Sequence, residues 1–351
     1  MKNPTRRIYD HQSNHSSSYW NRANAKQKSQ RLIKLFIAVI ILFALGNLLV
    51  RLPGWVGNLN QPFGNIQTNI AIEGKVNGKY RTNILLISVS ERNSLQDVAL
   101  ASLSSSRESV TFLRIPRSPK MYSSGVDQDM SLSAAYFSKP YRDSEFDSLY
   151  LSVKELLALP IDGYFVFVEN DLKFDENGIR SIHGKINSFR VLPKFFSYKS
   201  WLNENMKTNY AVGSLWSLAW DFRKVNDDKL YFVNLDETVD SKQFSLSDID
   251  SLLRENLVDT GISNEQAVIE IVGENITLVI RVINNIGGST LNFSNNTEES
   301  KTKVILGSDK NKAAQRIAGF LNVEVEKKEI ESGADIKVVV SSQFEVDFYG
   351  Q

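Results

Sequence analysis

Residues 83–118 read NILLISVSERNSLQDVALASLSSSRESVTFLRIPRS, and this stretch decides the fold. It contains three apolar runs rich in β-branched residues, at 84–89, 98–103 and 110–115, separated by two short polar breaks. This pattern is typical of buried strands joined by tight connections. We therefore predict that the three runs form the centre of a sheet.

Charged side chains lie at the ends of these predicted strands, where they could carry chemistry. Glu91 and Arg92 follow the first run, Asp97 opens the second, and Arg114 and Arg117 close the third. Arg117 follows a proline at a strand end, which directs it toward the crevice where α/β sheets bind ligands. A phosphate contact and a surface salt bridge are both open for this arginine.

Other charged residues of this region also have two interpretations each. Asp97 could ligate a cation, or it could be a strand-start residue that is solvated or paired with Arg92; Mg²⁺ sites usually draw on more than one carboxylate. Arg114 could contact substrate, although its alternating neighbours also fit a solvent face. Asp127 and Asp129 have a D-x-D spacing that could hold a cation, but a Gly-Ser loop favours two solvated turn formers.

Composition excludes several classes of protein. The chain has 351 residues and is 42% hydrophobic, which suffices for two domains. A net charge of +1 gives no reason to expect a nucleic-acid partner. The absence of cysteine excludes disulfides and thiolate chemistry. Outside the first 31 residues the only histidine is His183, which leaves little material for a zinc site or a Ser-His-Asp triad.

The N-terminal part has the pattern of a single-pass membrane protein. Residues 1–31 form a basic, polar segment with one acid, Asp10, which predicts a disordered cytoplasmic tail. Residues 32–50, LIKLFIAVIILFALGNLLV, are apolar and long enough to span a bilayer. The basic flank predicts that everything beyond the span is extracytoplasmic. A cleaved signal peptide, ending near Gly46, is the alternative.

Beyond a Gly- and Pro-rich juxtamembrane spacer at 51–80, strands and helices alternate. This alternation predicts an α/β fold: a sandwich domain with a central, mostly buried sheet at 81–240, a linker helix at 241–264 and a small α/β domain at 265–351. In the first domain we expect helices at 131–137, 146–157 and 212–222, the last capped by Thr208, and strands at 163–169 and 230–235. In the second we expect strands at 267–272, 304–306 and 336–340, and helices at 276–286 and 309–321, with Gly287-Gly288 as a helix stop.

Several motifs in this order resemble the LytR-CpsA-Psr (LCP) family. After one predicted membrane span the chain carries GKYRTNILLISVS, LQDVALASL, VTFLRIPRS, SLSAAYF and LPIDGYFVFV. The segments SDKNKAAQRIAGFL and ADIKVVVSSQFE resemble the LytR C-terminal domain. The resemblance covers about residues 78–236 and 267–348. It identifies 81–240 as LCP-like and 265–351 as LytR C-terminal-like.

The resemblance implies a cell-envelope function. Members of the family are phosphotransferases of the bacterial cell membrane that move a glycopolymer from a polyprenyl-pyrophosphate carrier onto peptidoglycan. They use a divalent cation and several arginines on the pyrophosphate, which is sound chemistry because charge builds up on the leaving group. The implied partners are the membrane, a polyprenyl-phosphate lipid or glycopolymer, and peptidoglycan. Mg²⁺ is the implied cofactor if the protein is active.

The match to the family's functional residues is partial. Asp97 and Arg117 are retained, and they are the candidate catalytic residues, with Asp97 as the candidate metal ligand. The aspartate that normally ends the first strand falls on Ser90, and a further arginine falls on Leu95. Ser118 replaces the acid that follows the retained arginine.

The family's arginine-rich block also has no counterpart. The corresponding segment, residues 186–210, holds only Arg190. With Arg92 and Arg114, this residue completes the set of candidate substrate-binding arginines. An aromatic cluster in the same segment could line a lipid-accepting groove or pack as ordinary core: Phe189, Phe195, Phe196, Tyr198 and Trp201.

These losses remove much of the charge compensation that phosphoryl transfer needs. We therefore predict a catalytically degenerate protein that binds polyprenyl-phosphate-linked glycopolymer or wall glycan and acts in cell wall or surface polymer assembly. An active Mg²⁺-dependent phosphotransferase with rearranged arginines is the alternative, and a purely structural adaptor is the third. Activity would require Arg117, Arg190 and Asp97 to converge at one apolar cavity.

Overall fold

The computed structural model describes residues 80–123, 128–138, 145–168, 173–187, 205–235, 245–274, 276–294 and 301–344. These residues form two α/β lobes, the first lobe at 80–235 and the second lobe at 245–344, within one compact unit, Asn60–Gln351. None of the helices in these ranges is long and apolar enough to cross a membrane. The predicted tail, membrane span and spacer lie outside the described residues.

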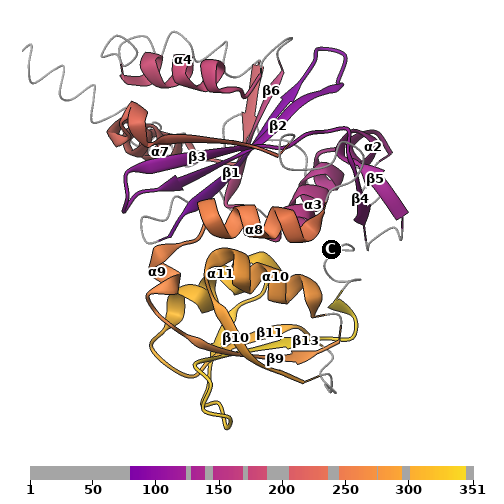
Figure 1. Ribbon diagram of the computed structural model, residues 1–351, viewed down its shortest axis with the longest axis vertical. Coiled ribbons are helices and arrows are strands. Elements are labelled where there is room, and N and C mark those ends of the chain that lie inside the picture. Colours follow the sequence, from indigo (N-terminus) through magenta and orange to yellow (C-terminus); the bar gives the residue numbers. More distant parts are fainter. Residues whose placement is uncertain are drawn as a thin grey trace, which may run out of the picture. The chain divides into compact units, whose positions relative to one another are not determined.

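The first lobe is built on a six-stranded sheet with helices over both faces (Figure 1). The strand order is β7-β6-β1-β2-β3-β8. A separate two-stranded sheet pairs β4 with β5. The elements are β1 (Thr82–Val89), β2 (Leu95–Ser104), β3 (Ser109–Arg114), β4 (Lys120–Ser123), β5 (Gln128–Ser131), α2 (Leu132–Ser138), α3 (Glu145–Leu157), β6 (Gly163–Val168), α4 (Glu176–Asn187), β7 (Met206–Thr208), α7 (Val212–Lys224), the 3₁₀ turn η1 (Asp227–Lys229) and β8 (Leu230–Asn234).

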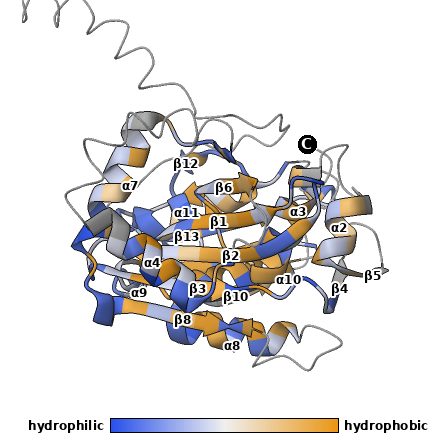
Figure 2. Ribbon diagram, turned by 90° about the horizontal axis from the view of Figure 1, so that it is seen from above, coloured by the Kyte–Doolittle hydropathy of each residue, from blue (hydrophilic) through white to orange (hydrophobic). Residues whose placement is uncertain are grey.

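The three apolar runs of the opening stretch form the centre of this sheet, as predicted. Strands β1, β2 and β3 are joined as antiparallel neighbours, while β6 and β8 add in parallel on either side. Every residue of β1 is buried, and Figure 2 shows that this strand is mainly hydrophobic. Because both faces of the sheet are covered, the strands read as continuous apolar runs rather than alternating ones.

Alternate residues of the central strands serve two different cores. Leu85 and Ile87 belong to a cluster that includes α2, α3 and residues of the second lobe. Ile84 and Leu86 belong to a second cluster with residues of α4 and α7. This division follows from the period of two in a strand, which sends successive side chains to opposite faces.

Two local features fix strand ends, one at each end of β1. The β1–β2 connection is a tight turn in which Asn93 adopts a left-handed conformation (φ 59°), which asparagine tolerates better than most residues. The start of β6 needs a glycine at position 163, because a Cβ there would lie 2.3 Å from a ring carbon of Tyr210. The ring of Tyr210 thus packs directly on the backbone of β6.

The second lobe has a five-stranded sheet of order β10-β9-β13-β11-β12. The buried residues of α10 and α11 share one hydrophobic cluster with the inner face of this sheet and with α8. Helix α10 ends at Gly287, whose left-handed backbone (φ 96°) forms the predicted stop. The elements are α8 (Leu246–Asn256), α9 (Thr260–Ser263), β9 (Val268–Gly273), α10 (Thr277–Ile286), β10 (Ser289–Ser294), β11 (Lys303–Leu306), α11 (Asn311–Leu321), β12 (Val325–Lys327) and β13 (Ile336–Val340).

The sequence-based expectations failed mainly at short elements. The prediction that Thr208 caps the helix over 212–222 is wrong, because Ala211 is the N-cap of α7. Thr208 instead ends β7, and its hydroxyl donates to the carbonyl of Tyr164 at 2.6 Å. The strands β4, β5, β7, β10 and β12 and the helices α4 and α9 were not predicted. Each of these strands is only three to six residues long, so its periodic signal is weak. Helix α4 does have a helical period, since Ile179, Ile182 and Ile186 are three and four residues apart, and this signal was missed.

Candidate functional site

The candidate site lies at the edge of the six-stranded sheet where β1 ends and β2 begins. Of the five candidate site residues, the structure brings three together around the first residues of β2: Asp97, Arg114 and Arg117. Arg114 ends β3, and Arg117 follows it after a short turn through Ile115. The hairpin register explains the meeting, since Ala99 pairs with Arg114 and Asp97 lies two residues before Ala99 on the same face.

Asp97 is buried, and both of its carboxylate oxygens accept hydrogen bonds from the protein. Oδ1 accepts from Nε of Arg114 at 3.2 Å and from the backbone N–H of Val98 at 3.1 Å. Oδ2 accepts from the backbone N–H of Phe174 at 2.8 Å. The expectation that this carboxylate pairs with Arg92 or is solvated is wrong, since its partner is Arg114 and its exposed fraction is 3%.

The arginines at this edge are only partly used. One third of the Arg114 side chain (34%) stays exposed beyond its contact with Asp97. Arg117 is half-buried, and its Nη1 donates to the carbonyl of Leu95. Arg92 is exposed on the tight turn between β1 and β2. Three arginines therefore lie at one end of the central strands, and among the described residues of β1, the turn at 90–94 and β2 the acids are the buried Asp97 and the exposed Glu91.

The turn at residues 90–94 is closed by its own hydrogen bonds. The Ser90 hydroxyl lies 2.6 Å from the Ser94 hydroxyl and accepts from the backbone N–H of Ser94 at 3.1 Å. The backbone N–H of Asn93 donates to the carbonyl of Ser90 at 2.8 Å. Tyr136 of α2 anchors the turn from outside, because its hydroxyl donates to Oδ1 of Asn93 at 2.8 Å.

The residues at this edge do not fit Mg²⁺. A magnesium site usually draws on several oxygen ligands, but among the described residues at this edge Asp97 is the only buried carboxylate, and it already accepts three hydrogen bonds from N–H groups of the protein. The Ser90 hydroxyl is held by Ser94. Ser88, beside Asp97 on the neighbouring strand, is buried with a hydroxyl that lacks a partner within the described ranges, yet one neutral oxygen cannot replace a carboxylate. The part of the chain that the structure covers holds no group of three His, Cys, Asp or Glu residues suited to a metal.

Other candidate residues lie elsewhere or outside the described ranges. Arg190, Asp127 and the aromatic cluster fall among residues that the structure does not describe, so those predictions stay predictions. Asp129 is exposed in the β4–β5 hairpin. His183 of α4 is buried, with Nδ1 at 2.7 Å from Asp227 Oδ1 and Nε2 donating to the Val225 carbonyl at 2.9 Å. This histidine therefore ties α4 to the segment after α7.

The sequence alone did not reveal the hydrogen-bond donors that contact Asp97. The Phe174 contact comes from a backbone N–H that lies 77 residues along the chain, and a backbone donor leaves no trace in side-chain patterns. The Arg114 contact could have been found from the hairpin register alone, because diagonal neighbours on one face of a sheet are within reach of long side chains.

Together these observations define a mixed α/β protein whose main sheet is covered on both faces and carries an arginine-lined edge at the start of β2. No family model matches the chain, and no curated protein matches it.

Among solved structures, parts of the chain are similar to several bacterial proteins. The crystal structure of TagV from B. subtilis is 12% identical, with 50% of this chain and 94% of that chain covered and a TM-score of 0.39. TagT bound to LIIa-WTA is 12% identical, with 56% and 94% covered and a TM-score of 0.37. A transcriptional regulator from Enterococcus faecalis is 10% identical, with 46% and 78% covered and a TM-score of 0.35. These values are too low for any of the three to assign an activity to this chain.

Proposed function

We propose that this chain is an LCP-like protein of the bacterial cell envelope that binds a polyprenyl-phosphate-linked glycopolymer or wall glycan without transferring it. In this proposal, residues 32–50 anchor it in the cell membrane with its N-terminus in the cytoplasm. Both lobes then face the cell wall, where the protein assists wall or surface polymer assembly. The proposal combines the ordered motif resemblance with the chemistry of the sheet edge at β2.

The observation that carries the proposal is the state of Asp97. In the family that the sequence resembles, the role implied for this carboxylate is to hold a cation close to the phosphates, as acidic residues do in many phosphoryl transfers. Here its two oxygens accept three hydrogen bonds, one of them from Arg114 at 3.2 Å. Replacing these donors with a metal would leave the guanidinium and a buried backbone N–H without partners, which costs free energy. The carboxylate therefore supports the sheet edge rather than a metal.

Anion binding needs less than catalysis does. Arg92, Arg114 and Arg117 place three permanent positive charges on one edge, and arginine forks match phosphate oxygens in geometry as well as charge. A phosphate or pyrophosphate headgroup could bind there without any cation. Charge-assisted hydrogen bonds to such a headgroup contribute about 1.5–3 kcal/mol each, which is sufficient for recognition but not for cleavage.

The test measures binding and turnover with the full chain in detergent micelles. The probe is undecaprenyl pyrophosphate, titrated with and without Mg²⁺, and phosphate release is followed in the same samples. We expect binding that does not require Mg²⁺, no turnover, and a weakening of about tenfold or more for Arg117→Ala, the loss of one charge-assisted contact.

Arg107→Ala is the matched control. Arg107 is exposed in the β2–β3 connection at the opposite end of the same strands, so the change removes an equal charge without touching the edge. Binding should be unchanged in that variant. Mg²⁺-dependent turnover that disappears in Arg117→Ala would establish the active transferase instead. If the wild-type chain binds neither undecaprenyl pyrophosphate nor purified wall glycan, the structural adaptor is the correct function.

A further inference from the structure

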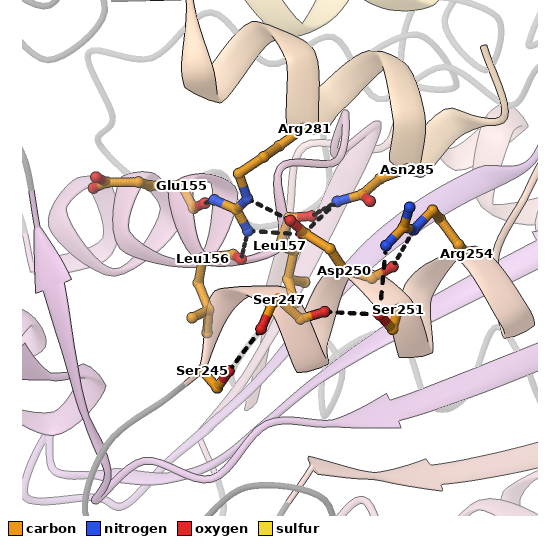
Figure 3. Close-up of polar contacts among 10 residues, drawn as sticks. All are labelled: Glu155, Leu156, Leu157, Ser245, Ser247, Asp250, Ser251, Arg254, Arg281 and Asn285. Atoms are coloured by element: carbon orange, nitrogen blue, oxygen red, sulfur yellow. Dashed lines mark hydrogen bonds and ion pairs between the residues drawn. The ribbon is translucent and has the colours of Figure 1, made fainter. Parts of the chain in front are cut away.

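The most extensively bonded charged cluster of the described chain lies where the two lobes meet, far from the candidate site in sequence. Figure 3 shows Arg281 of α10 reaching between α8 and the end of α3. Its Nε and Nη2 donate to the two oxygens of Asp250 at 2.8 and 2.9 Å. The same guanidinium donates to the carbonyls of Glu155 at 3.0 Å and Leu156 at 2.8 Å.

Asn285, one turn further along α10, completes the cluster. Its Nδ2 donates to the carbonyl of Leu157 at 3.1 Å and to Oδ1 of Asp250 at 2.8 Å. Three consecutive carbonyls at the C-terminal end of α3 thus find donors on one helix of the second lobe. These are carbonyls that an α-helix cannot satisfy internally. A positive charge there also interacts favourably with the negative end of the helix dipole.

The burial of the cluster separates it from an ordinary surface salt bridge. The side chains of Arg281 and Asp250 are only 11% and 14% exposed. Ions this deeply buried are stable only if hydrogen bonds satisfy them on all sides. Arg281 would lose its partners in α3 if the second lobe moved away, so separation of the lobes would break several bonds at once.

Two further polar contacts tie the second lobe to the start of β1. The backbone N–H of Arg81 donates to Oδ2 of Asp259, the N-cap of α9, at 2.6 Å. Arg316 of α11 pairs with Asp162, whose other oxygen accepts from the backbone N–H of Asn83 at 2.7 Å. The lobes are therefore joined at three places by bonds from different helices.

The hydrophobic core is continuous across the same boundary. One cluster of buried side chains includes Leu149 and Leu156 of α3, Ile249 of α8 and Val282 of α10. Figure 1 shows α8 lying between α3 and α10, in agreement with the contacts of α8 with both helices. Two lobes that share a core in this way are expected to unfold together rather than as separate domains.

We propose that the second lobe is a fixed structural partner of α3. In this proposal Arg281 and Asn285 hold α3 in place, and α3 together with α2 supports the turn at residues 90–94. The link from α3 to the turn runs through α2. Helices α2 and α3 pack on each other within the shared core. Tyr136 of α2 bonds Asn93 in the turn, and the backbone N–H of Ser133 donates to the carbonyl of Arg117 at 3.2 Å.

This assignment gives the second lobe a definite task. It fixes one end of α3, and α2 carries that constraint to the edge where Arg92 and Arg117 lie. The lobe is therefore not a free adaptor module on a flexible linker, because the helix faces that such a module would present are already used. Physical coupling of this kind must be shown by a measured response at the distant segment.

The experiment measures amide hydrogen exchange of the full chain in detergent micelles, comparing wild type with Arg281→Met. We expect exchange to become about tenfold faster or more in three places: the C-terminal turn of α3, the first turn of α2 and residues 90–94. Amides that exchange through local opening respond to the contacts of their own cooperative unit. Thermal unfolding of the wild type should show one transition for both lobes.

Arg254→Met is the matched control. Arg254 lies one turn from Asp250 on α8 and bonds only within its own helix, to the carbonyl of Asp250 at 3.1 Å and to Ser251 at 3.4 Å (Figure 3). It removes the same charge and the same side-chain volume. Exchange at residues 90–94 should not change in this variant.

A second control separates coupling from general loss of stability. Ile330→Ala creates a cavity in a different cluster of the second lobe, shared with Ile305 and Val339. It should speed exchange around β11 and β12 but not in α2 or at residues 90–94. If Arg281→Met does not fold, Asn285→Ala tests the same contact with a milder change.

Three results would overturn the proposal. Exchange at residues 90–94 could be no faster in Arg281→Met than in the control Arg254→Met. If Arg281→Met does not fold, the same comparison is made with Asn285→Ala. Ile330→Ala could speed exchange at residues 90–94 equally. The second lobe could also unfold in its own transition while the first lobe stays folded. None of these outcomes depends on whether the sheet edge binds a phosphate.

Discussion

The molecule has two carboxylate–guanidinium pairs of similar chemistry and different surroundings. At the sheet edge, Asp97 meets Arg114 through one contact of 3.2 Å, and a third of the arginine stays exposed. At the lobe boundary, Asp250 and Arg281 form a two-pronged contact at 2.8 and 2.9 Å, and little of either side chain is exposed. Each carboxylate accepts three hydrogen bonds, but only the first arginine keeps a large exposed fraction.

The difference in exposure implies different roles for the two pairs. The arginine of the Asp97–Arg114 pair can also bind a ligand, whereas the Asp250–Arg281 pair stabilises the fold. Arg281 gives four of its five N–H donors to Asp250 and to two carbonyls of α3, so little remains for an external group. Arg114 uses one donor, its Nε, on Asp97, and about a third (34%) of its side chain is exposed. We therefore expect changes at the lobe boundary to affect stability most, and changes at the sheet edge to affect binding most.

Arg281→Met has the largest expected effect on stability. It leaves the carboxylate of Asp250 buried without its cation, and removal of one partner from a buried pair costs about 3–5 kcal/mol. The free energy of unfolding from urea titration of the full chain measures it. In Arg281→Met/Asp250→Leu, the unpaired charge is gone as well, and a good part of the loss should return. A loss below about 1 kcal/mol in the single variant would show that the pair is effectively solvated.

A change at Lys154, which also lies at the lobe boundary, should increase the free energy of unfolding, whereas Arg281→Met should decrease it. This lysine of α3 is buried, with its Nζ 4.8 Å from the ring centre of Phe320 of α11 and 5.9 Å from that of Tyr150. Burial lowers the pKa of Lys154 from 10.5 to about 7. Each pKa unit corresponds to about 1.4 kcal/mol. After allowing for the lost cation contacts, we expect Lys154→Met to raise the free energy of unfolding at pH 7 by about 1–3 kcal/mol.

The pH dependence of stability has a definite sign at this residue. Between pH 7 and 10.5 the unfolded chain holds the Lys154 proton more tightly than the folded chain does. Stability from this group therefore rises as the pH increases through that window, and below pH 7 its unfavourable contribution is constant. Urea titrations at pH 7, 8.5 and 10 should show this rise in the wild type and a flatter profile in Lys154→Met. Equal profiles in the two proteins would exclude the lowered pKa.

The contrast between the two pairs also shows what could be predicted from the sequence. The central strands were predictable because burial on both faces makes β1, β2 and β3 continuous apolar runs. The lobe boundary was not, because Arg281 and Asp250 are 31 residues apart and Arg281 reaches the carbonyl of Glu155 across 126 residues. An arginine in a helix shows no sign in the sequence that its partners are carbonyls elsewhere.

For the candidate site, the sequence predicted the residues but not their hydrogen-bond partners. The family pattern marked Asp97 and Arg117, and the structure places both at the start of β2. It could not indicate that the carboxylate is occupied, since the donors are a backbone N–H of Phe174 and a side chain from the next strand. The serine at position 90 could be read from the sequence, whereas the closure of that turn by serine hydroxyls needed the three-dimensional arrangement.

Asp97→Asn should have a smaller effect on stability than Arg281→Met. The amide keeps the shape but replaces one acceptor with a donor, which then faces either Arg114 or the N–H of Phe174. An unsatisfied buried group costs about 1–3 kcal/mol, and urea titration measures it. Binding of undecaprenyl pyrophosphate should persist, because removing the acid frees Arg114. Loss of binding together with loss of bound Mg²⁺ would instead identify Asp97 as a metal ligand.

Arg114→Lys is the mildest change, and it tests directly whether the exposed part of Arg114 binds a phosphate at the sheet edge. A lysine can still neutralise Asp97, so we expect the free energy of unfolding to change by about 0.5 kcal/mol or less, as is usual for partly exposed pairs. It cannot hold the carboxylate and also present a planar fork to a phosphate, because its charge sits on a single nitrogen. Affinity for undecaprenyl pyrophosphate should therefore fall by about three- to tenfold while stability stays the same, and the matched change Arg107→Lys should alter neither. If affinity survives in Arg114→Lys but falls in Arg92→Lys and Arg117→Lys, the exposed third of Arg114 is not part of the anion site, and its pair with Asp97 is as purely structural as the one between Arg281 and Asp250.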